Sequence, residues 1–247
     1  MNKLFGLGFL AISAMAAQPV QATEYFKDLP GLDLTVNGAW VSDYRFRGVS
    51  QTDEKPALQG GMDLIYPIAE DIDAYVGAWG SGVDFNDGNE GRYEVDYYGG
   101  VALENSGVAY DIGFIYYSYP SARDNLNYNF FEYAASVGYD FNGLFTTLSL
   151  NYSPNNFGNS GDALYTKIAA EYSFYPNFTL NSYIGRQDVQ NNVAFTLDDY
   201  NDWGFGAAYN WDDNFTVGLN YIDMNTSQAD CADNCDGTII LSVSKSF

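Results

Sequence analysis

The chain has 247 residues, with 32 Asp and Glu against 10 Lys and Arg, 22 Tyr, 17 Phe and no His. A net charge of −22 repels phosphate backbones and excludes nucleic-acid binding. The composition also excludes catalysis by an imidazole base. An aromatic content of 17% excludes a disordered chain, and a slightly negative mean hydropathy excludes a bundle of membrane-spanning helices.

The N-terminal segment, residues 1–22, has the pattern of a secretory signal peptide. Lys3 precedes an apolar stretch that runs to Ala17, and Val20 and Ala22 are the small residues of a cleavage site. The alternative is an N-terminal membrane anchor, but the stretch is short for a span and no basic stop-transfer segment follows it. We therefore expect export and cleavage, which leave one mature domain of residues 23–247.

The mature chain alternates apolar and polar residues with the period of a β-strand. In residues 131–141, for example, Phe131 and Tyr133 begin an apolar face that opposes Glu132 and Ala134. About twelve such segments are present. They are centred near residues 37, 62, 76, 98, 113, 135, 148, 168, 182, 205, 219 and 242.

The connections between these segments alternate in length. The long ones cover residues 42–55, 81–92, 120–127, 153–162, 187–198 and 225–236, and the short ones cover 67–71, 104–107, 142–143, 175–177 and 212–214. The pair Asn142-Gly143 predicts a type I′ hairpin turn. Long and short loops in alternation are typical of an up-and-down antiparallel transmembrane β-barrel, and an even strand number places both termini in the periplasm.

A secreted soluble β-sandwich or lectin shows the same alternation, but three features favour the barrel. The strands are about 10 to 12 residues long, as a tilted span requires. Aromatic residues gather at strand ends, as at Trp40, Tyr44 and Phe46. The alternating C-terminus ends in Phe247, although Lys245 stands where such signals carry an apolar residue, and this pattern is similar to the assembly signal of outer-membrane barrels. We expect an all-β barrel in the bacterial outer membrane that contacts lipids, lipopolysaccharide and the barrel-assembly machinery.

A long motif gives a family resemblance. Residues 42–61 read SDYRFRGVSQTDEKPALQGG, residues 75–85 read YVGAWGSGVDF, and the chain ends LSVSKSF. Together they resemble the TorF family of proteobacterial porins, formerly of unknown function. The resemblance covers the mature chain and implies an outer-membrane barrel of Gram-negative bacteria that acts as a porin. It does not name a solute, since a fold does not fix a function.

Continuing the phase of the first strand through residue 47 places Tyr44 and Phe46 toward lipid, and Arg45 and Arg47 toward the lumen. The phases of residues 72–80 and 178–187, including Arg186, stay undetermined. The predicted pore-lining residues are Asp43, Arg45, Arg47, Asp63, Glu94, Asp96, Asp111, Glu132, Asp140, Lys167, Glu171 and Asp202. Because unpaired buried charges are costly, these groups face either water or one another. A water-filled pore and a salt-bridged plug both satisfy that requirement.

Other chemistry has weaker support in the sequence. A glycosidase-like carboxylate pair would have to come from Glu94, Asp96 and Glu132, and we expect no enzyme. Two acidic loops, with Asp84, Asp87 and Glu90 in one and Asp230, Asp233 and Asp236 in the other, could collect Ca²⁺ or simply be solvated. In an oxidising space Cys231 and Cys235 favour a disulfide over zinc, which needs more ligands.

The function that the sequence predicts is passive diffusion of small hydrophilic solutes, with a weak preference for cations and no cofactor. The alternative is a closed structural or surface-binding barrel.

Overall fold

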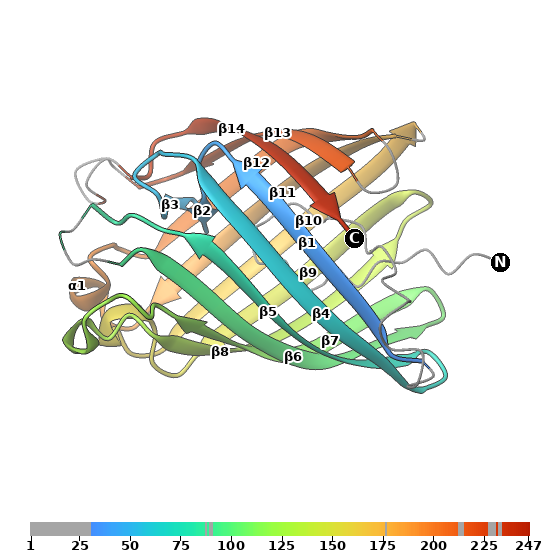
Figure 1. Cartoon of the computed structure of the whole chain (residues 1–247), viewed down its shortest axis with the longest axis horizontal. Helices are drawn as coiled ribbons and strands as arrows, with labels where there is room; N and C mark the ends of the chain where they lie inside the picture. Colours follow the sequence, from blue (N-terminus) through green and yellow to red (C-terminus); the bar gives the residue numbers. More distant parts are fainter. Residues whose placement is uncertain are drawn as a thin grey trace.

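The computed structural model describes residues 31–86, 88, 91–175, 177–211, 215–226, 231 and 234–247, which form a closed antiparallel barrel (Figure 1). The predicted signal peptide, residues 1–22, lies outside the described residues. The twelve barrel strands are β1 (Asp33–Val41), β4 (Ala57–Ala69), β5 (Ile72–Gly82), β6 (Tyr93–Asn105), β7 (Val108–Ser118), β8 (Phe130–Asp140), β9 (Leu144–Ser153), β10 (Ala163–Tyr175), β11 (Phe178–Val189), β12 (Tyr200–Asn210), β13 (Phe215–Met224) and β14 (Thr238–Ser246). The prediction of a twelve-stranded barrel is confirmed.

Each barrel strand pairs with its neighbours along the chain, and β1 closes the ring by pairing with β14. Trp40 lies opposite Val243 in this seam. Beyond it, the N–H of Phe247 donates to the carbonyl of Val36 over 2.8 Å, and Val36 donates back over 3.3 Å. Closure satisfies the backbone groups that an open sheet edge would leave unpaired.

The long loops gather at one end of the barrel, and the short turns lie with the C-terminus at the other (Figure 1). Asn142 and Gly143 have φ angles of 61° and 98°, which confirms the predicted type I′ turn. In the described parts of the long loops there are three short helices, η1 (Asp124–Leu126), η2 (Phe157–Asn159) and α1 (Asn192–Phe195). Among the described residues, no helix is long and apolar enough to cross a membrane.

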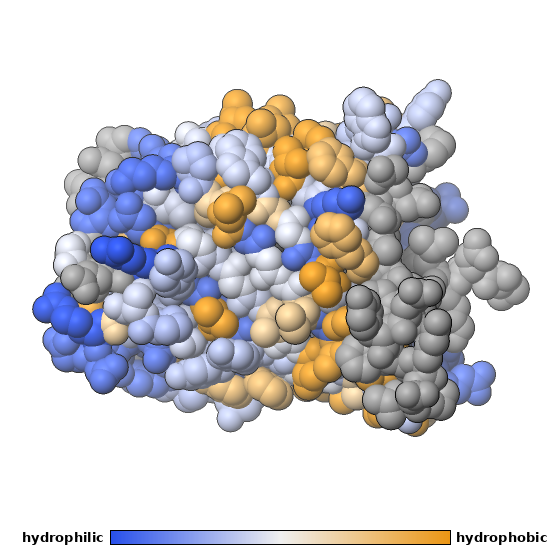
Figure 2. All heavy atoms as spheres, viewed as in Figure 1, coloured by the Kyte–Doolittle hydropathy of each residue, from blue (hydrophilic) through white to orange (hydrophobic). Residues whose placement is uncertain are grey.

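The outer face of the barrel is apolar. Leu58, near the loop end of β4, is 73% exposed, and Ile112, in the middle of β7, is 71% exposed. Patches of hydrophobic residues lie along the wall in Figure 2. The end with the long loops is hydrophilic. The two undetermined phases are now assigned: Tyr75 and Trp79 of β5 point inward, and Arg186 of β11 points outward to Asp188. An apolar outer surface around a polar lumen is the arrangement expected of a barrel in the hydrocarbon core of a membrane.

One prediction is wrong: the first strand ends at Val41, and Tyr44 and Phe46 do not face lipid. Val41 pairs directly with Ala57, so the sheet is complete without residues 42–56. This segment, called the plug from here on, turns into the barrel. Tyr44 is buried with its ring 5.4 Å from that of Trp79, and Phe46 packs against an inward tyrosine. The rings are buried because the inner wall offers both aromatic and polar partners to them.

Candidate functional site: a plugged polar lumen

The plug contains a short hairpin of β2 (Arg45–Phe46) and β3 (Val49–Ser50). Its two turn residues, Arg47 and Gly48, have φ angles of 50° and 86°, as a type I′ turn requires. A Cβ on Gly48 would lie 3.1 Å from both the Cβ of Asp202 and the sulfur of Met224. The Arg-Gly dipeptide therefore forms a tight turn whose tip fits closely against the inner wall.

Hydrogen bonds to one carboxylate organise the plug internally. Asp43 accepts from the hydroxyls of Ser50 (2.6 Å) and Thr52 (2.9 Å), and from Nε of Arg45 (2.5 Å). All four of these residues are buried. Because a buried carboxylate needs several donors, the spacing of Asp, Arg, Ser and Thr in the motif fixes the shape of the segment.

Arg47 projects from the tip of the plug into the lumen. Its guanidinium donates to Glu132 of β8 over 2.7 Å and to the side-chain oxygen of Gln187 of β11 over 2.8 Å. It also lies 4.6 Å from the ring centre of Phe46 and 4.4 Å from that of Tyr165. Burial disfavours the charged guanidinium, but Glu132 outweighs this and holds the pKa of Arg47 above its ordinary value. Arg47 thus ties the plug to two strands.

A second contact joins the plug to β6. The Tyr44 hydroxyl donates to Glu94 over 2.9 Å, and Tyr119 lies against the same carboxylate. Burial, together with Glu94 and Asp96, raises the pKa of Tyr44 well above its usual value, so its hydroxyl keeps the proton that it donates. Glu94 and Asp96 are themselves sealed from solvent. At the level of Glu94 and Asp96, the acidic side chains of the wall therefore face the plug.

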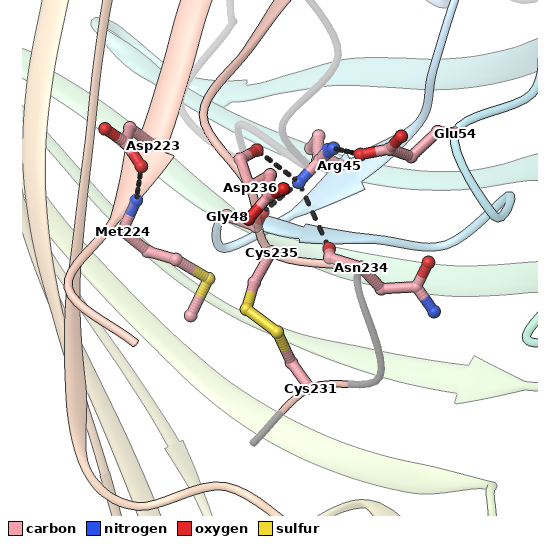
Figure 3. Close-up of a disulfide and its surroundings, with 9 residues drawn as sticks. All are labelled: Arg45, Gly48, Glu54, Asp223, Met224, Cys231, Asn234, Cys235 and Asp236. Carbon is pink, nitrogen blue, oxygen red and sulfur yellow. Dashed lines mark hydrogen bonds and ion pairs between the residues drawn. A yellow bond between two sulfur atoms is a disulfide. The ribbon is translucent and has the colours of Figure 1, made fainter. Parts of the chain in front are cut away.

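The third contact involves the loop between β13 and β14, where the predicted disulfide between Cys231 and Cys235 is confirmed (Figure 3). Nη1 of Arg45 donates to the backbone carbonyls of Asn234 (3.1 Å) and Asp236 (3.2 Å). Plug and loop are therefore joined through Arg45, a residue that is 3% exposed.

Beneath the plug the lumen contains a cavity of about 460 Å³. Its wall extends from Phe46 and Arg47 to Ser173 and Ser246, near the end with the short turns. Many of the side chains between these limits are Ser, Thr, Asn or Tyr. The cavity can hold water and small polar solutes, whereas the plug contacts wall residues near the loop ends of their strands, Glu94, Glu132 and Gln187.

The structure distributes the predicted lining residues over four places. Asp43, Arg45 and Arg47 reach the cavity from the plug rather than from the first strand. The cavity wall itself includes Asp63, Asp111, Lys167, Glu171 and Asp202. Glu94, Asp96 and Glu132 lie behind the plug and are fully buried. Asp140 lies at the end of β8, where its carboxylate accepts from the N–H of Gly143 in the turn.

Inward tyrosines hold the wall acids, a role that the sequence pattern alone does not reveal. Tyr98 donates to Asp63 (2.5 Å), Tyr75 to Asp111 (3.0 Å), and Tyr165 to Asp202 (3.1 Å). For Tyr98 and Tyr165 the inward phase on the strand was the available signal, whereas Tyr75 lies in residues 72–80, whose phase the sequence left undetermined. A tyrosine also suits the interfacial belt. Gly185 makes room for one of these pairs, since a Cβ there would overlap the Tyr165 hydroxyl and the Asp202 carboxylate.

The two acidic loops give no evidence for a calcium site. Asp87, Glu90, Asp230 and Asp233 lie outside the described residues, and Asp84 pairs with Lys55 over 3.0 Å. Within the described ranges, no group of three or more acidic or cysteine side chains could hold a metal ion.

Solved outer-membrane channels share this fold. The chain is similar to the KdgM porin, with 9% identity, a TM-score of 0.54 and coverage of 86% of this chain and 99% of that one. KdgM has also been solved in complex with disordered oligogalacturonate. The NanC porin has 10% identity, a TM-score of 0.55 and coverage of 87% and 98%. An outer membrane channel from Pseudomonas putida F1 has 9% identity, a TM-score of 0.55 and coverage of 89% and 97%. At these identities the likeness shows the fold alone.

Sequence comparison gives the family. No curated protein matches the chain, and the resemblance to the TorF family stays a prediction. Residues 28–247 match the family described as "Bacterial protein of unknown function (Gcw_chp)". The match covers the whole barrel, from before β1 to the last residue. The chain therefore belongs to the bacterial Gcw_chp family.

Proposed function

We propose that this chain is an outer-membrane, porin-like channel for the passive diffusion of small hydrophilic solutes. The observation that carries the proposal is a polar cavity of about 460 Å³ inside a closed barrel with an apolar outer wall. A structural barrel has no need of a hydrated lumen, because side chains can fill it. Passive diffusion requires neither catalysis nor a cofactor.

The proposed location follows from the two faces and two ends of the barrel. The apolar wall contacts outer-membrane lipids, the hydrophilic long loops face lipopolysaccharide, and the short turns and both termini face the periplasm. Residues 1–22 direct export, residues 23–247 form the barrel, and the barrel-assembly machinery recognises the end at Phe247. The outer-membrane channels that share this fold support the location.

The charge of the wall supports a weak preference for cations. Asp63, Asp111, Glu171 and Asp202 line the cavity, against Lys167 on the wall and the guanidinium of Arg47 above it. Carboxylates in a narrow wet channel with apolar walls raise the local concentration of cations. The same charges disfavour polyanions such as the oligogalacturonate found with KdgM. We therefore propose small cations and neutral hydrophilic solutes as the cargo.

One observation favours the alternative of a closed barrel. The plug contacts β6, β8, β11 and the disulfide loop, and the wall acids behind it are sealed from solvent. If the plug never moves and leaves no path beside it, the barrel does not conduct. The channel proposal requires either a narrow path along the plug or its displacement.

Single-channel recording of two proteins decides between these functions. The first is the wild-type chain. The second is a plugless variant in which Asn-Gly replaces residues 42–56, since Val41 and Ala57 already face each other as a hairpin-closing pair. We expect small steps of conductance from the wild type and larger ones from the plugless variant. A silent wild type beside a conducting plugless variant supports the closed barrel, and silence of both after verified insertion overturns the proposed function.

A further inference from the structure

The disulfide loop is built around the buried arginine of the plug. In Figure 3 the backbone on either side of Cys235 turns its carbonyl groups toward Arg45, from Asn234 and from Asp236. The carbonyl of Asn234 also accepts from the N–H of Ser50 over 2.7 Å. The two residues that flank Cys235 therefore supply three of the hydrogen bonds that hold the β2–β3 hairpin.

Arg45 needs these acceptors because it is buried. Nη1 also donates to the carbonyl of Gly48 over 3.0 Å, and Nη2 pairs with Glu54 over 3.0 Å. A guanidinium removed from water must have its donors satisfied, so the loss of acceptors makes the seated position of the plug costly. Arg45 thus couples the position of the plug to the position of the loop.

The disulfide fixes that position. Cys235 is 2% exposed and packs with Leu197, Tyr200 and Met224, and Val49 of the plug lies against the same cluster. The ring closed by the Cys231–Cys235 bond includes Asn234 and ends at Cys235, and Asp236 follows directly, so the bond restricts Asn234 and anchors the residue before Asp236. In the reduced chain this restriction is lost, and the carbonyls are free to leave Arg45.

We propose that the Cys231–Cys235 disulfide is a redox-sensitive latch for the plug. In the oxidised protein the loop holds Arg45 and the plug stays seated. In the reduced protein the loop relaxes and the plug leaves the lumen more often. The reductant is a thiol or dithiol. A thiolate attacks the sulfur of Cys231, which is the more exposed of the two, and Cys235 leaves as a thiolate that takes up a proton. A second thiolate, from the same dithiol or another thiol, then attacks the reductant sulfur of this mixed disulfide. Cys231 leaves as a thiolate that takes up a proton, and the products are two protein thiols and one reductant disulfide.

Limited proteolysis of the full chain in lipid vesicles tests the latch without reference to transport. Trypsin can cut after Arg45 and Arg47, both buried in the seated plug, whereas Lys55 precedes Pro56 and is a poor site. With dithiothreitol as the reductant, we expect cleavage at Arg45 and Arg47 to become about tenfold faster, because each lost hydrogen bond to a charged group favours opening. Cleavage after the exposed Arg92 is the internal control and should keep its rate.

A double variant, Cys231→Ser with Cys235→Ser, makes the test independent of the reagent. Its plug should be cut at the fast rate with and without dithiothreitol, while heat-modifiable migration on gels reports that its barrel has folded. Alkylation of the thiols shows whether the wild-type protein is fully reduced. If its cleavage rate at Arg45 and Arg47 is then unchanged, the latch is overturned. A slow cleavage rate in the folded double variant overturns it as well.

The consequence for transport rests on the proposed function, and a separate measurement decides it. Dithiothreitol should increase the conductance of the wild type and leave that of the double variant unchanged. If proteolysis accelerates but the plugless variant is silent, the latch stands and the proposed function fails. If the plugless variant conducts but neither proteolysis nor conductance responds to reduction, the function stands and the latch fails.

Discussion

Nη2 of Arg47 lies 2.7 Å from Oε2 of Glu132, and the two side chains are 7% and 1% exposed. They come from positions 85 residues apart in the chain, and only the inward turn of the plug brings them together. Removing one member of a buried pair leaves the other charge without compensation, which is far more costly than losing a surface pair. Because the ion pair forms only when the plug is seated, its loss should appear as a lower free energy of unfolding.

We expect Arg47→Ala to lower the free energy of unfolding by about 3 to 5 kcal/mol, because the Glu132 carboxylate is left buried and unpaired. Adding Glu132→Gln should recover at least half of the loss. Urea unfolding of the barrel in lipid vesicles measures both. The matched control is Arg186→Ala, which removes the exposed pair with Asp188 and should cost less than about 1 kcal/mol. Simple additivity of the two substitutions at positions 47 and 132 would contradict the pairing.

The turn at the tip of the plug gives a second prediction. Gly48→Ala should unseat the plug, because position 48 has a φ of 86° and a Cβ there meets Asp202 and Met224. The strain of a left-handed conformation alone costs about 1 kcal/mol. Gly82→Ala is the control, since a Cβ at Gly82 has no atom within 4 Å. Faster tryptic cleavage at Arg47 in the first variant only is the expected result, and equal cleavage in both would oppose it.

The barrel could be predicted from the sequence because its signal is local. Alternation in residues such as Glu132 and Tyr133 assigns each side chain to a face, and the pair Asn142-Gly143 marks a turn. The plug could not be predicted in the same way. Tyr44 and Phe46 continue the alternation of β1, and the decision to turn inward depends on partners such as Glu94 on distant strands. The inward turn also decides which wall acids face water and which face the plug. That assignment could therefore not be predicted from the sequence either.

The C-terminus gives a third prediction, on assembly. Deleting Phe247 removes both backbone hydrogen bonds to Val36 beyond the seam, together with the ring that lies 4.9 Å from the Lys245 ammonium. We expect the wild type in outer-membrane fractions with heat-modifiable migration on gels, and a severe loss of that species in the deletion variant. Deletion of the exposed Asn125 in an outer loop should have little effect. Similar losses in both variants would mean that the terminal residue has no special part in insertion.

The charges of the cavity wall give a fourth prediction. Asp63→Asn combined with Asp111→Asn should move the reversal potential in a KCl gradient toward that of Cl⁻, because both carboxylates line the cavity. Lys167→Gln should move it toward that of K⁺. Asp124→Asn, on an exposed outer loop, should leave it unchanged. All shifts should shrink at 1 M salt, where the screening length falls to about 3 Å.

The reversal potential of the wild-type channel in a KCl gradient tests the proposed function most directly. It reports in one reading whether ions cross the barrel and which sign of charge crosses more easily. The acidic wall around Lys167 predicts a potential displaced moderately toward the equilibrium potential of K⁺. A potential displaced toward that of Cl⁻, or no current from either the wild type or the plugless variant after verified insertion, would contradict it.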